Sequence, residues 1–256
     1  MTDNKQIKAI IMDLDRTLLH TDKTISDYSI SILKKCRERG IRIMAASARP
    51  LRDILIYRDL IEFDAITATN GAVVLLPNGV MEIGLSCQSG EVILTRLLSF
   101  EDVILSIETS KGLYANKDIP EWHPIVYDQF PQLPKGCILY KVLASSKHKD
   151  LYESIQDVLT DDVYYTVAGG ELIQILSFEA TKWKGIMRML AYFDIRAENA
   201  ACFGDDNDDI ESIQKCGLGV AVANAIEAVK AVSNVITVSN DMDGVARFIE
   251  KHILSE

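Results

Sequence analysis

Short apolar runs alternate along the first part of the chain with segments whose apolar residues recur at helical spacing. Residues 10–12 form the first run, and residues 27–39 follow with one apolar face and Gly40 in position to end a helix. Residues 41–46 form the next apolar run. This order predicts a right-handed unit in which two parallel strands are joined by a helix.

The pattern continues for one more repeat and then changes. Pro50 suits the first turn of a helix that extends to about residue 60, and residues 65–69 predict a third strand. Residues 72–76 and 80–83, separated by Pro-Asn-Gly, predict a hairpin. The first part of the chain therefore predicts a sheet that ends in a hairpin.

From residue 84 the pattern is less regular, with alternating polar and apolar positions at residues 138–143 and 172–175. We interpret residues 84–180 as an inserted α+β domain. The strand and helix rhythm then resumes, with helices expected at residues 181–193, 209–215, 225–232 and 243–254, and strands at 200–203, 218–221 and 235–238.

This order of elements predicts an α/β fold with a doubly wound, Rossmann-like parallel sheet. Residues 1–83 and 181–256 would form the sheet domain, and residues 84–180 would interrupt it as an α+β cap.

Composition narrows the class of protein. The chain has 256 residues, 48% of them hydrophobic, which is ample for a core. A net charge of −10 without a basic run argues against nucleic acid or an anionic membrane as the main partner. The first six residues lack the basic and apolar regions of a secretory signal, and no apolar run is long enough to span a membrane. We expect a cytoplasmic protein.

The cysteines are odd in number, widely spaced and without a C-x-x-C pair. We interpret them as small, buried apolar residues of a protein in a reducing compartment. They are Cys36, Cys87, Cys137, Cys202 and Cys216.

Two carboxylates follow the first apolar run. Asp13 and Asp15 come at the carboxyl end of the expected strand, where open α/β sheets bind their ligands. Strand alternation would send both side chains to the same side, close enough to share a cation. Oxygen ligands without Cys or His favour Mg²⁺ over zinc or copper. The alternative is an acidic pair that begins a surface loop.

A second acidic group follows the expected strand at residues 200–203. It contains Asp205, Asp206, Asp208 and Asp209, whose mutual repulsion calls for a cation or a run of backbone donors. The alternative is a solvated helix start, because Asp favours the first turn of a helix. We prefer that alternative for Asp206 and metal-related roles for Asp205 and Asp209.

Four segments near the ends of expected strands share a recognisable order and spacing. They are residues 13–18 (Asp-Leu-Asp-Arg-Thr-Leu), 46–50 (Ala-Ser-Ala-Arg-Pro), 181–186 (Thr-Lys-Trp-Lys-Gly-Ile) and 204–209 (Gly-Asp-Asp-Asn-Asp-Asp). Together they resemble the motifs of the haloacid dehalogenase (HAD) superfamily of phosphatases, in particular the Cof-type branch with a large α/β cap. Residues 69–72 and 241–246 also resemble segments of that branch.

The resemblance implies a role for each acid. Asp13 would be the nucleophile that forms an aspartyl phosphate, and Asp15 the general acid and then base. Mg²⁺ would be held by Asp13, Asp15 and Asp205, with the backbone carbonyl of Asp15 as its ligand and Asp209 in support. The metal would offset the repulsion between an anionic nucleophile and an anionic phosphate.

The remaining phosphate oxygens need donors. The resemblance implies contacts from the Ser47 hydroxyl and the Ala48 backbone N–H, and a positive charge from a lysine. We choose Lys182 for its spacing to the residues that follow, with Lys184 as the alternative. Arg49 would orient the Ser47 loop or form a surface ion pair.

Three positions depart from the family pattern. Arg16 and Ala48 each stand where the family often has Gly, and Asp208 stands at a phosphate-binding position that is usually Asn. The extra carboxylate of Asp208 would repel a substrate phosphate unless it turns toward the metal or is protonated. These departures bear on catalytic efficiency more than on the class of reaction.

The sequence therefore predicts a Mg²⁺-dependent phosphomonoester hydrolase that acts on a small phosphorylated metabolite. Sugar phosphates are the leading expectation, followed by flavin and pyridoxal phosphates. The resemblance implies a catalytic core of residues 1–83 and 181–256 and a cap of residues 84–180 that selects the substrate, because a lid that excludes water also contacts the leaving group. The cap candidates by residue type are Tyr114, Trp122, His123, Tyr127, Tyr164 and Glu171. Two alternatives are a phosphotransferase or phosphomutase, in which the aspartyl phosphate passes to an acceptor other than water, and a non-catalytic sensor of phosphorylated metabolites.

Overall fold

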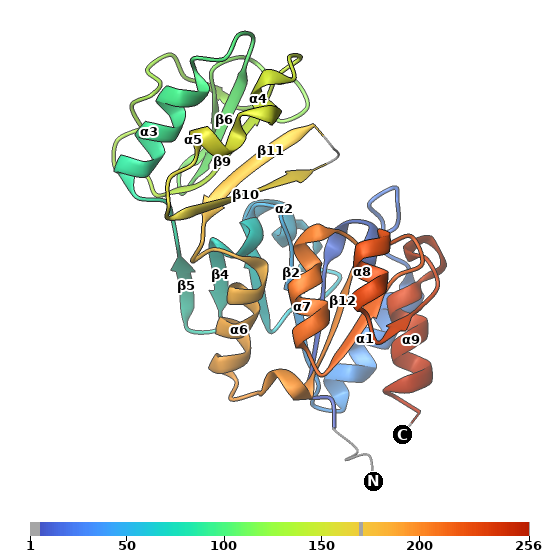
Figure 1. Cartoon of the computed structure of the whole chain (residues 1–256). Coiled ribbons are helices and arrows are strands. Elements are labelled where there is room, and N and C mark those ends of the chain that lie inside the picture. Colours follow the sequence, from blue (N-terminus) through green and yellow to red (C-terminus); the bar gives the residue numbers. More distant parts are fainter. Residues whose placement is uncertain (1–5, 169–170, 256) are drawn as a thin grey trace. The chain divides into compact units, whose positions relative to one another are not determined.

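The computed structural model describes residues 6–168 and 171–255 (Figure 1). The chain divides into two units. The core unit comprises Met1–Met81 and Lys182–Glu256, and the inserted unit comprises Glu82–Thr181. Among the described residues no helix has the length and apolar character needed to cross a membrane.

An eight-stranded sheet forms the centre of the core unit, in the order β14-β13-β12-β1-β2-β3-β4-β5. Its strands are β1 (Ala9–Met12), β2 (Arg42–Ala46), β3 (Ala65–Ala68), β4 (Val73–Leu76), β5 (Gly79–Glu82), β12 (Ala200–Gly204), β13 (Leu218–Ala221) and β14 (Val235–Ile236). The pairs from β14 to β3 are parallel, and β3 pairs with β4 in antiparallel fashion. All residues of β1 and β12 are buried, as continuous apolar runs predict for strands covered on both faces.

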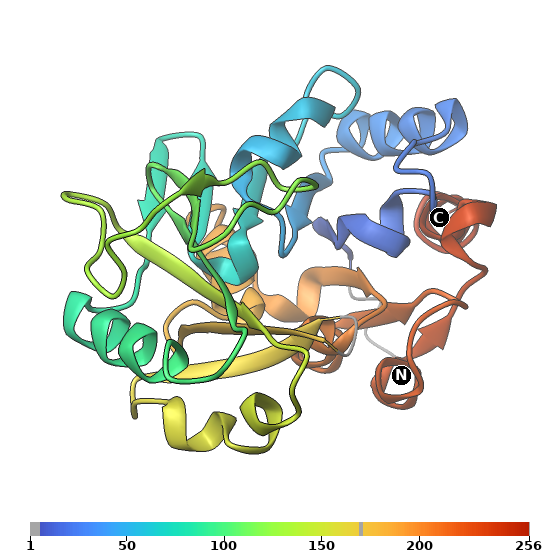
Figure 2. The same cartoon turned by 90° about the horizontal axis from the view of Figure 1, so that it is seen from above.

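Helices cover both faces of this sheet (Figures 1 and 2). They are α1 (Asp27–Glu38), α2 (Leu51–Ile54), α6 (Lys182–Tyr192), α7 (Ile210–Lys215), α8 (Glu227–Val232) and α9 (Gly244–His252). Helix α1 packs beside α9, whereas α6 packs against β3 and α7 against β12 and β13. A Cβ atom on Gly185 of α6 would lie 2.1 Å from Thr67 Oγ1, so glycine permits this close packing. These layers confirm the predicted α/β class.

The inserted unit is an antiparallel sheet with helices on one face. Its strand order is β10-β11-β9-β6-β7-β8, and β7 and β8 form its parallel pair. Its elements are α3 (Cys87–Leu97), β6 (Ile104–Thr109), β7 (Gly112–Ala115), β8 (Ile125–Val126), β9 (Leu139–Ser145), α4 (Asp150–Glu153), α5 (Ile155–Val158), β10 (Val163–Ala168) and β11 (Leu172–Ser177). Apolar residues of α3, α4 and α5 form one buried cluster with Leu105, Ile107, Val142, Ala144, Ile173 and Ile175 of the sheet.

Several element bounds differ from the prediction. The helix expected from Pro50 to residue 60 is the single turn α2 followed by a 3₁₀ turn at Leu55–Tyr57. The helix expected from residue 209 begins as a 3₁₀ turn at Asn207–Asp209. Strand β14 ends at Ile236, two residues earlier than expected. Local hydrogen bonding at the ends of elements decides such bounds, which apolar periodicity does not resolve.

One cysteine pair contradicts the interpretation of the cysteines as free thiols. Cys202 of β12 and Cys216, directly after α7, form a disulfide with their Cα atoms 6.2 Å apart. Cys36 is free and buried as expected, whereas the free Cys87 is exposed. Helix α7 returns the chain toward the strand from which it came, so residues that are widely spaced in sequence become neighbours.

Candidate active site

The candidate site begins with Asp13, at the sheet edge where the segment after β1 lies beside the segment after β12. Asp13 directly follows β1, and its backbone N–H donates to the Phe203 carbonyl of β12 at 3.0 Å. Strands β1 and β12 are parallel neighbours, so their carboxyl ends lie at the same edge of the sheet. Asp205 directly follows β12 and therefore lies beside Asp13.

Three buried carboxylates gather at this edge. One carboxylate oxygen from each of Asp13, Asp205 and Asp209 lies within 4.8 Å of the others. The three residues are only 7%, 5% and 2% exposed. Like charges at such distances inside a protein repel one another, so the cluster requires a compensating cation.

Lys182 supplies part of this compensation. Its Nζ donates to Asp13 Oδ1 at 2.9 Å and to Asp209 Oδ1 at 2.8 Å, and the residue is 5% exposed. When all three carboxylates are ionised, the single ammonium leaves two uncompensated negative charges. A divalent cation would balance them, and the all-oxygen donor set fits a hard cation such as Mg²⁺ or Ca²⁺. The buried acids of this structure could therefore bind a divalent metal.

The pKa values of the cluster reflect this imbalance. Burial raises the pKa of Asp13 well above its usual value, and the neighbouring Asp209 and Asp205 raise it further against the opposing effect of Lys182. Burial, followed by the charge of Asp209, raises the pKa of Asp205 to about 6. Burial alone would lower the pKa of Lys182, but Asp13 and Asp209 raise it well above its usual value. A bound cation would favour the ionised carboxylates.

Backbone and hydroxyl donors fix two of the acids. Asp209 Oδ2 accepts from the backbone N–H groups of Asp205 at 3.0 Å and Asp206 at 3.2 Å. The Thr17 hydroxyl donates to Asp205 Oδ1 at 2.7 Å. A Cβ atom on Gly204 would lie 2.4 Å from Asp209 Cβ, so the Asp209 side chain needs glycine there. Asp206 is exposed and caps the turn, which agrees with its expected structural role.

Asp15 lies outside the buried cluster. Strand β1 ends at Met12, and the turn that follows contains Arg16 at φ +60°, so strand alternation does not apply to Asp15. Its carboxylate instead accepts from Arg49, by Nε at 2.6 Å and Nη2 at 2.7 Å, and from Lys23 Nζ at 2.6 Å. The expectation that alternation would direct both side chains toward one cation is therefore wrong.

The cations around Asp15 favour its charged form. Burial raises the pKa of Asp15, but the hydrogen bonds and charges of Arg49 and Lys23 outweigh burial and lower it. Arg49 thus forms an ion pair, and its backbone N–H also donates to Ser47 Oγ at 3.2 Å. The structure shows the ion-pair alternative for the Arg49 side chain, with Asp15 as its partner, whereas the bond to Ser47 comes from the Arg49 backbone.

The expected phosphate-binding residues lie in two loops. Ser47 directly follows β2 and is 1% exposed, and Ala48 is the next residue of the same loop. The Ser47 carbonyl accepts from the backbone N–H of Asn70 at 3.1 Å. The Asn70 side-chain amide in turn donates to Asp208 Oδ2. Asp208 is thus turned toward an amide donor and is not a member of the acidic cluster.

The two candidate lysines occupy different positions. Lys182 begins α6 and reaches the acidic cluster, whereas Lys184 lies two residues further along the helix and is half-buried. The residues that sequence reasoning left without a role are Thr17, Lys23, Tyr57 and Asn70. Thr17 and Asn70 lie inside motif-like segments, so their position in those segments could have indicated a role. Lys23 and Tyr57 lie outside every motif-like segment, and nothing in the sequence indicated a role for them.

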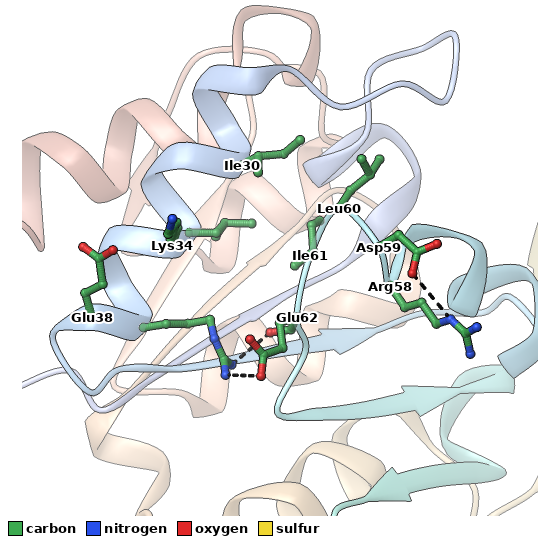
Figure 3. Close-up of a pocket in the computed structure, with 10 residues that line it drawn as sticks. Ile30, Lys34, Glu38, Arg58, Asp59, Leu60, Ile61 and Glu62 are labelled. Atoms are coloured by element: carbon green, nitrogen blue, oxygen red, sulfur yellow. Dashed lines mark hydrogen bonds and ion pairs between the residues drawn. The ribbon is translucent and has the colours of Figure 1, made fainter.

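A separate groove of about 650 Å³ lies between α1 and residues 58–62 (Figure 3). Its charges are largely paired, since Arg37 binds Glu62 at 2.9 Å and Arg58 contacts Asp59 at 3.8 Å. None of the candidate catalytic or phosphate-binding residues lines this groove. We therefore assign the candidate active site to the sheet edge and not to the groove.

Comparison with known proteins identifies the family. Residues 10–249 match the haloacid dehalogenase-like hydrolases, and the chain belongs to this family. It is 28% identical to the putative phosphatase YxeH of Bacillus subtilis, covering 97% of this chain and 99% of that protein. It is 27% identical to the 5-amino-6-(5-phospho-D-ribitylamino)uracil phosphatase YitU of the same organism, covering 95% and 96%.

A solved structure shares the fold of this chain. A haloacid dehalogenase-like hydrolase from B. subtilis superposes with a TM-score of 0.85 at 22% identity, covering 96% of this chain and 100% of the other. The protein is thus a phosphatase of the HAD superfamily, which confirms the resemblance found in its motifs.

Proposed function

We propose that the protein is a Mg²⁺-dependent phosphomonoester hydrolase that acts on small phosphorylated metabolites through an aspartyl phosphate at Asp13. The observation that carries this proposal is the buried group of Asp13, Asp205, Asp209 and Lys182 at the carboxyl edge of the sheet. Its uncompensated charge, oxygen donors and position suit a divalent cation and a phosphate.

The metal site would consist of Asp13, Asp205 and the backbone carbonyl of Asp15, with Asp209 in support. When bound, Mg²⁺ would offset the repulsion between the nucleophile and the phosphate. Asp209 already accepts two backbone N–H groups, and Thr17 already donates to Asp205. These contacts fix the acids before a cation arrives, which lowers the cost of organising the site.

The reaction would proceed in two displacements. A carboxylate oxygen of Asp13 attacks phosphorus, the bond from phosphorus to the ester oxygen breaks, and protonated Asp15 gives its proton to the leaving oxygen. Because Arg49 and Lys23 favour the ionised form of Asp15, its carboxylate would take up this proton from the medium before the step. Asp15 then accepts a proton from water as the water oxygen attacks the aspartyl phosphate. Phosphate leaves and the Asp13 carboxylate is restored.

The phosphate oxygens would meet three donors. The Ser47 hydroxyl and the Ala48 backbone N–H lie in one loop, and the Lys182 ammonium already contacts the nucleophile Asp13 at 2.9 Å. This lysine holds a positive charge beside the atom that attacks phosphorus, where negative charge accumulates. Asp208 would sit at the edge of this group, with its carboxylate bonded to Asn70.

The substrate class rests on the relatives and on the inserted unit. YitU and a second B. subtilis relative, YwtE, are named for a phosphorylated ribitylamino uracil, a small phosphomonoester with a polyol chain. We propose sugar phosphates first, with flavin and pyridoxal phosphates behind them. Residues 84–180 would select among them as a cap, and residues 1–83 with 181–256 would carry the chemistry.

The test is phosphate release from a panel of phosphorylated metabolites with and without Mg²⁺. We expect metal-dependent release by the wild type and a loss of at least about 10³-fold in Asp13→Asn, because an amide is a poor nucleophile. Asp206→Asn is the matched control, since Asp206 is exposed on the same loop as the cluster and Asn caps a turn equally well. Steady hydrolysis by purified Asp13→Asn would refute the nucleophile assignment.

The same assay distinguishes the hydrolase from the phosphotransferase, phosphomutase and sensor alternatives. A phosphotransferase would release little phosphate and, once an alcohol acceptor is added, would pass the phosphoryl group from Asp13 to that alcohol as a new ester. A phosphomutase would return the group to another hydroxyl of the substrate without net release of phosphate. A sensor would bind a phosphorylated metabolite without releasing phosphate from it. Asp15 favours hydrolysis over the sensor, because a carboxylate two residues after the nucleophile can activate water and has little use in a protein that only binds phosphate esters.

A further inference from the structure

Two cations from different segments determine the direction of the Asp15 carboxylate. Arg49 donates to both of its oxygens, by Nε to Oδ2 at 2.6 Å and by Nη2 to Oδ1 at 2.7 Å. Lys23 Nζ adds a third bond to Oδ1 at 2.6 Å. A two-pronged guanidinium contact fixes the plane of a carboxylate as well as its position. The direction of Asp15 therefore depends on what holds Arg49 and Lys23.

Tyr57 contacts both of these residues. Its hydroxyl donates to the Lys23 carbonyl at 3.1 Å and accepts from Arg49 Nη1 at 3.5 Å. The Arg49 guanidinium carbon lies 5.7 Å from the centroid of the Tyr57 ring, within the range of a cation–π contact. Tyr57 is 7% exposed, so it offers a fixed point for two more exposed side chains.

The turn that carries Lys23 needs such support. Lys23 has φ +68°, a left-handed conformation that is strained for a residue with a Cβ. Within the turn, the Lys23 N–H donates to His20 O at 2.9 Å and the His20 N–H donates to Thr24 O at 2.9 Å. The Tyr57 hydroxyl adds a bond from outside the turn to the carbonyl of the left-handed residue itself.

We propose that Tyr57 is a positioning residue for Asp15. Its hydroxyl keeps Lys23 and Arg49 in place on the carboxylate and so sets the direction from which Asp15 meets the leaving oxygen. The inference rests on the proposed function, in which Asp15 gives a proton to that oxygen while the ester bond to phosphorus breaks. Tyr57 lies outside the motif-like segments, and its hydroxyl bonds to Lys23 and Arg49 and not to Asp13, Asp205 or Asp209.

The test compares two leaving groups in Tyr57→Phe, which keeps the ring and removes the hydroxyl. An alkyl phosphomonoester needs a proton on its leaving oxygen, whereas p-nitrophenyl phosphate leaves as a stable anion. We choose an alkyl phosphomonoester that the wild type hydrolyses. For Tyr57→Phe we expect kcat/KM to fall about tenfold on this substrate and less than about twofold on p-nitrophenyl phosphate. The parameter kcat/KM isolates the first displacement from the later attack of water.

The matched control is Tyr28→Phe, which removes a hydroxyl of α1 that donates to Glu250 of α9 at 2.7 Å. We expect Tyr28→Phe to leave kcat/KM unchanged for both substrates. Equal losses of Tyr57→Phe on both substrates would indicate a general structural defect and overturn the proposal, as would the absence of any loss.

A crystal structure of Tyr57→Phe decides the positioning role independently of catalysis. We expect the Lys23 ammonium to leave hydrogen-bond distance of Asp15 in the variant, whereas a variant that retains all three contacts would overturn the inference. If the wild type hydrolyses no phosphomonoester at all, the proposed function fails, and the variant structure still supports or overturns the contact between Tyr57 and the cations of Asp15.

Discussion

Asp208 is the residue at which this chain departs most from the family pattern. Its carboxylate accepts from the Asn70 amide, and its charge, after those of Asp13 and Asp209, helps to raise the pKa of Lys182. The residue therefore adds negative charge near the ammonium proposed to bind phosphate. A substrate phosphate would approach against this charge.

Asp208→Asn should strengthen phosphate binding. The new amide removes the charge, and its oxygen can still accept from Asn70. We expect KM for a phosphomonoester, and the inhibition constant of inorganic phosphate, to fall about three- to tenfold with little change in kcat. Asp206→Asn, which removes an exposed charge two residues away, should leave both constants unchanged. An unchanged or raised KM in Asp208→Asn would contradict the repulsion argument.

Two helices of the core unit meet at a single carboxylate. Asp243 precedes α9 at φ +56°, and its Oδ1 accepts from the hydroxyls of Ser26 at 2.6 Å and Ser29 at 2.9 Å at the start of α1. His20 Nε2 lies 3.1 Å from the same oxygen. Burial raises the pKa of Asp243, but hydrogen bonds from Ser26, His20 and Ser29 outweigh it and lower the pKa.

Asp243→Asn tests this link between elements, because Asn tolerates the left-handed backbone and removes only the charge. A carboxyl whose folded pKa is lowered stabilises the fold above its unfolded pKa and loses this effect as pH falls through the folded pKa. We expect a loss of about 1–2 kcal/mol in unfolding free energy at pH 7 and a smaller loss near pH 3. Urea titrations at the two pH values measure the difference. A loss independent of pH would point to packing instead of charge.

At the scale of the whole molecule, the buried acids make stability depend on pH and metal together. Asp205 has its pKa raised to about 6 by burial and then by Asp209, so the folded state binds its proton more tightly than the unfolded state does. Stability should therefore fall as pH rises from about 4 to about 6 in the absence of metal, by up to about 3 kcal/mol from this group alone. A bound divalent cation would cancel the penalty by favouring the ionised form.

Comparison of the wild type with Asp205→Asn isolates this contribution from the other titrating groups. Without metal, we expect the variant to gain stability relative to the wild type between pH 4 and pH 7. Added Mg²⁺ should raise the Tm of the wild type by several degrees and the Tm of the variant much less. Equal shifts with Mg²⁺ in both proteins, measured by thermal unfolding, would show that Asp205 does not hold the cation.

The sequence alone determined the fold class and the general position of the chemistry. Apolar runs such as β1 and β12 must be buried wherever they fold, and the helices between them require parallel pairing. Carboxylates that directly follow such strands must then meet at one sheet edge. Asp13 and Asp205 each directly follow such a strand, and the family resemblance implied that they share one cation, whereas spacing alone paired Asp13 with Asp15.

Only the tertiary structure decided which groups contact one another beyond the ends of the strands. Asp15 turns to Arg49 and Lys23 because the chain leaves β1 in a turn with a left-handed residue, which strand periodicity does not encode. The Cys202–Cys216 disulfide and the bond from Asn70 to Asp208 likewise join segments that are brought together by helix packing. The physical reason is that periodicity reports burial, whereas side-chain pairing depends on backbone angles and on partners far along the chain.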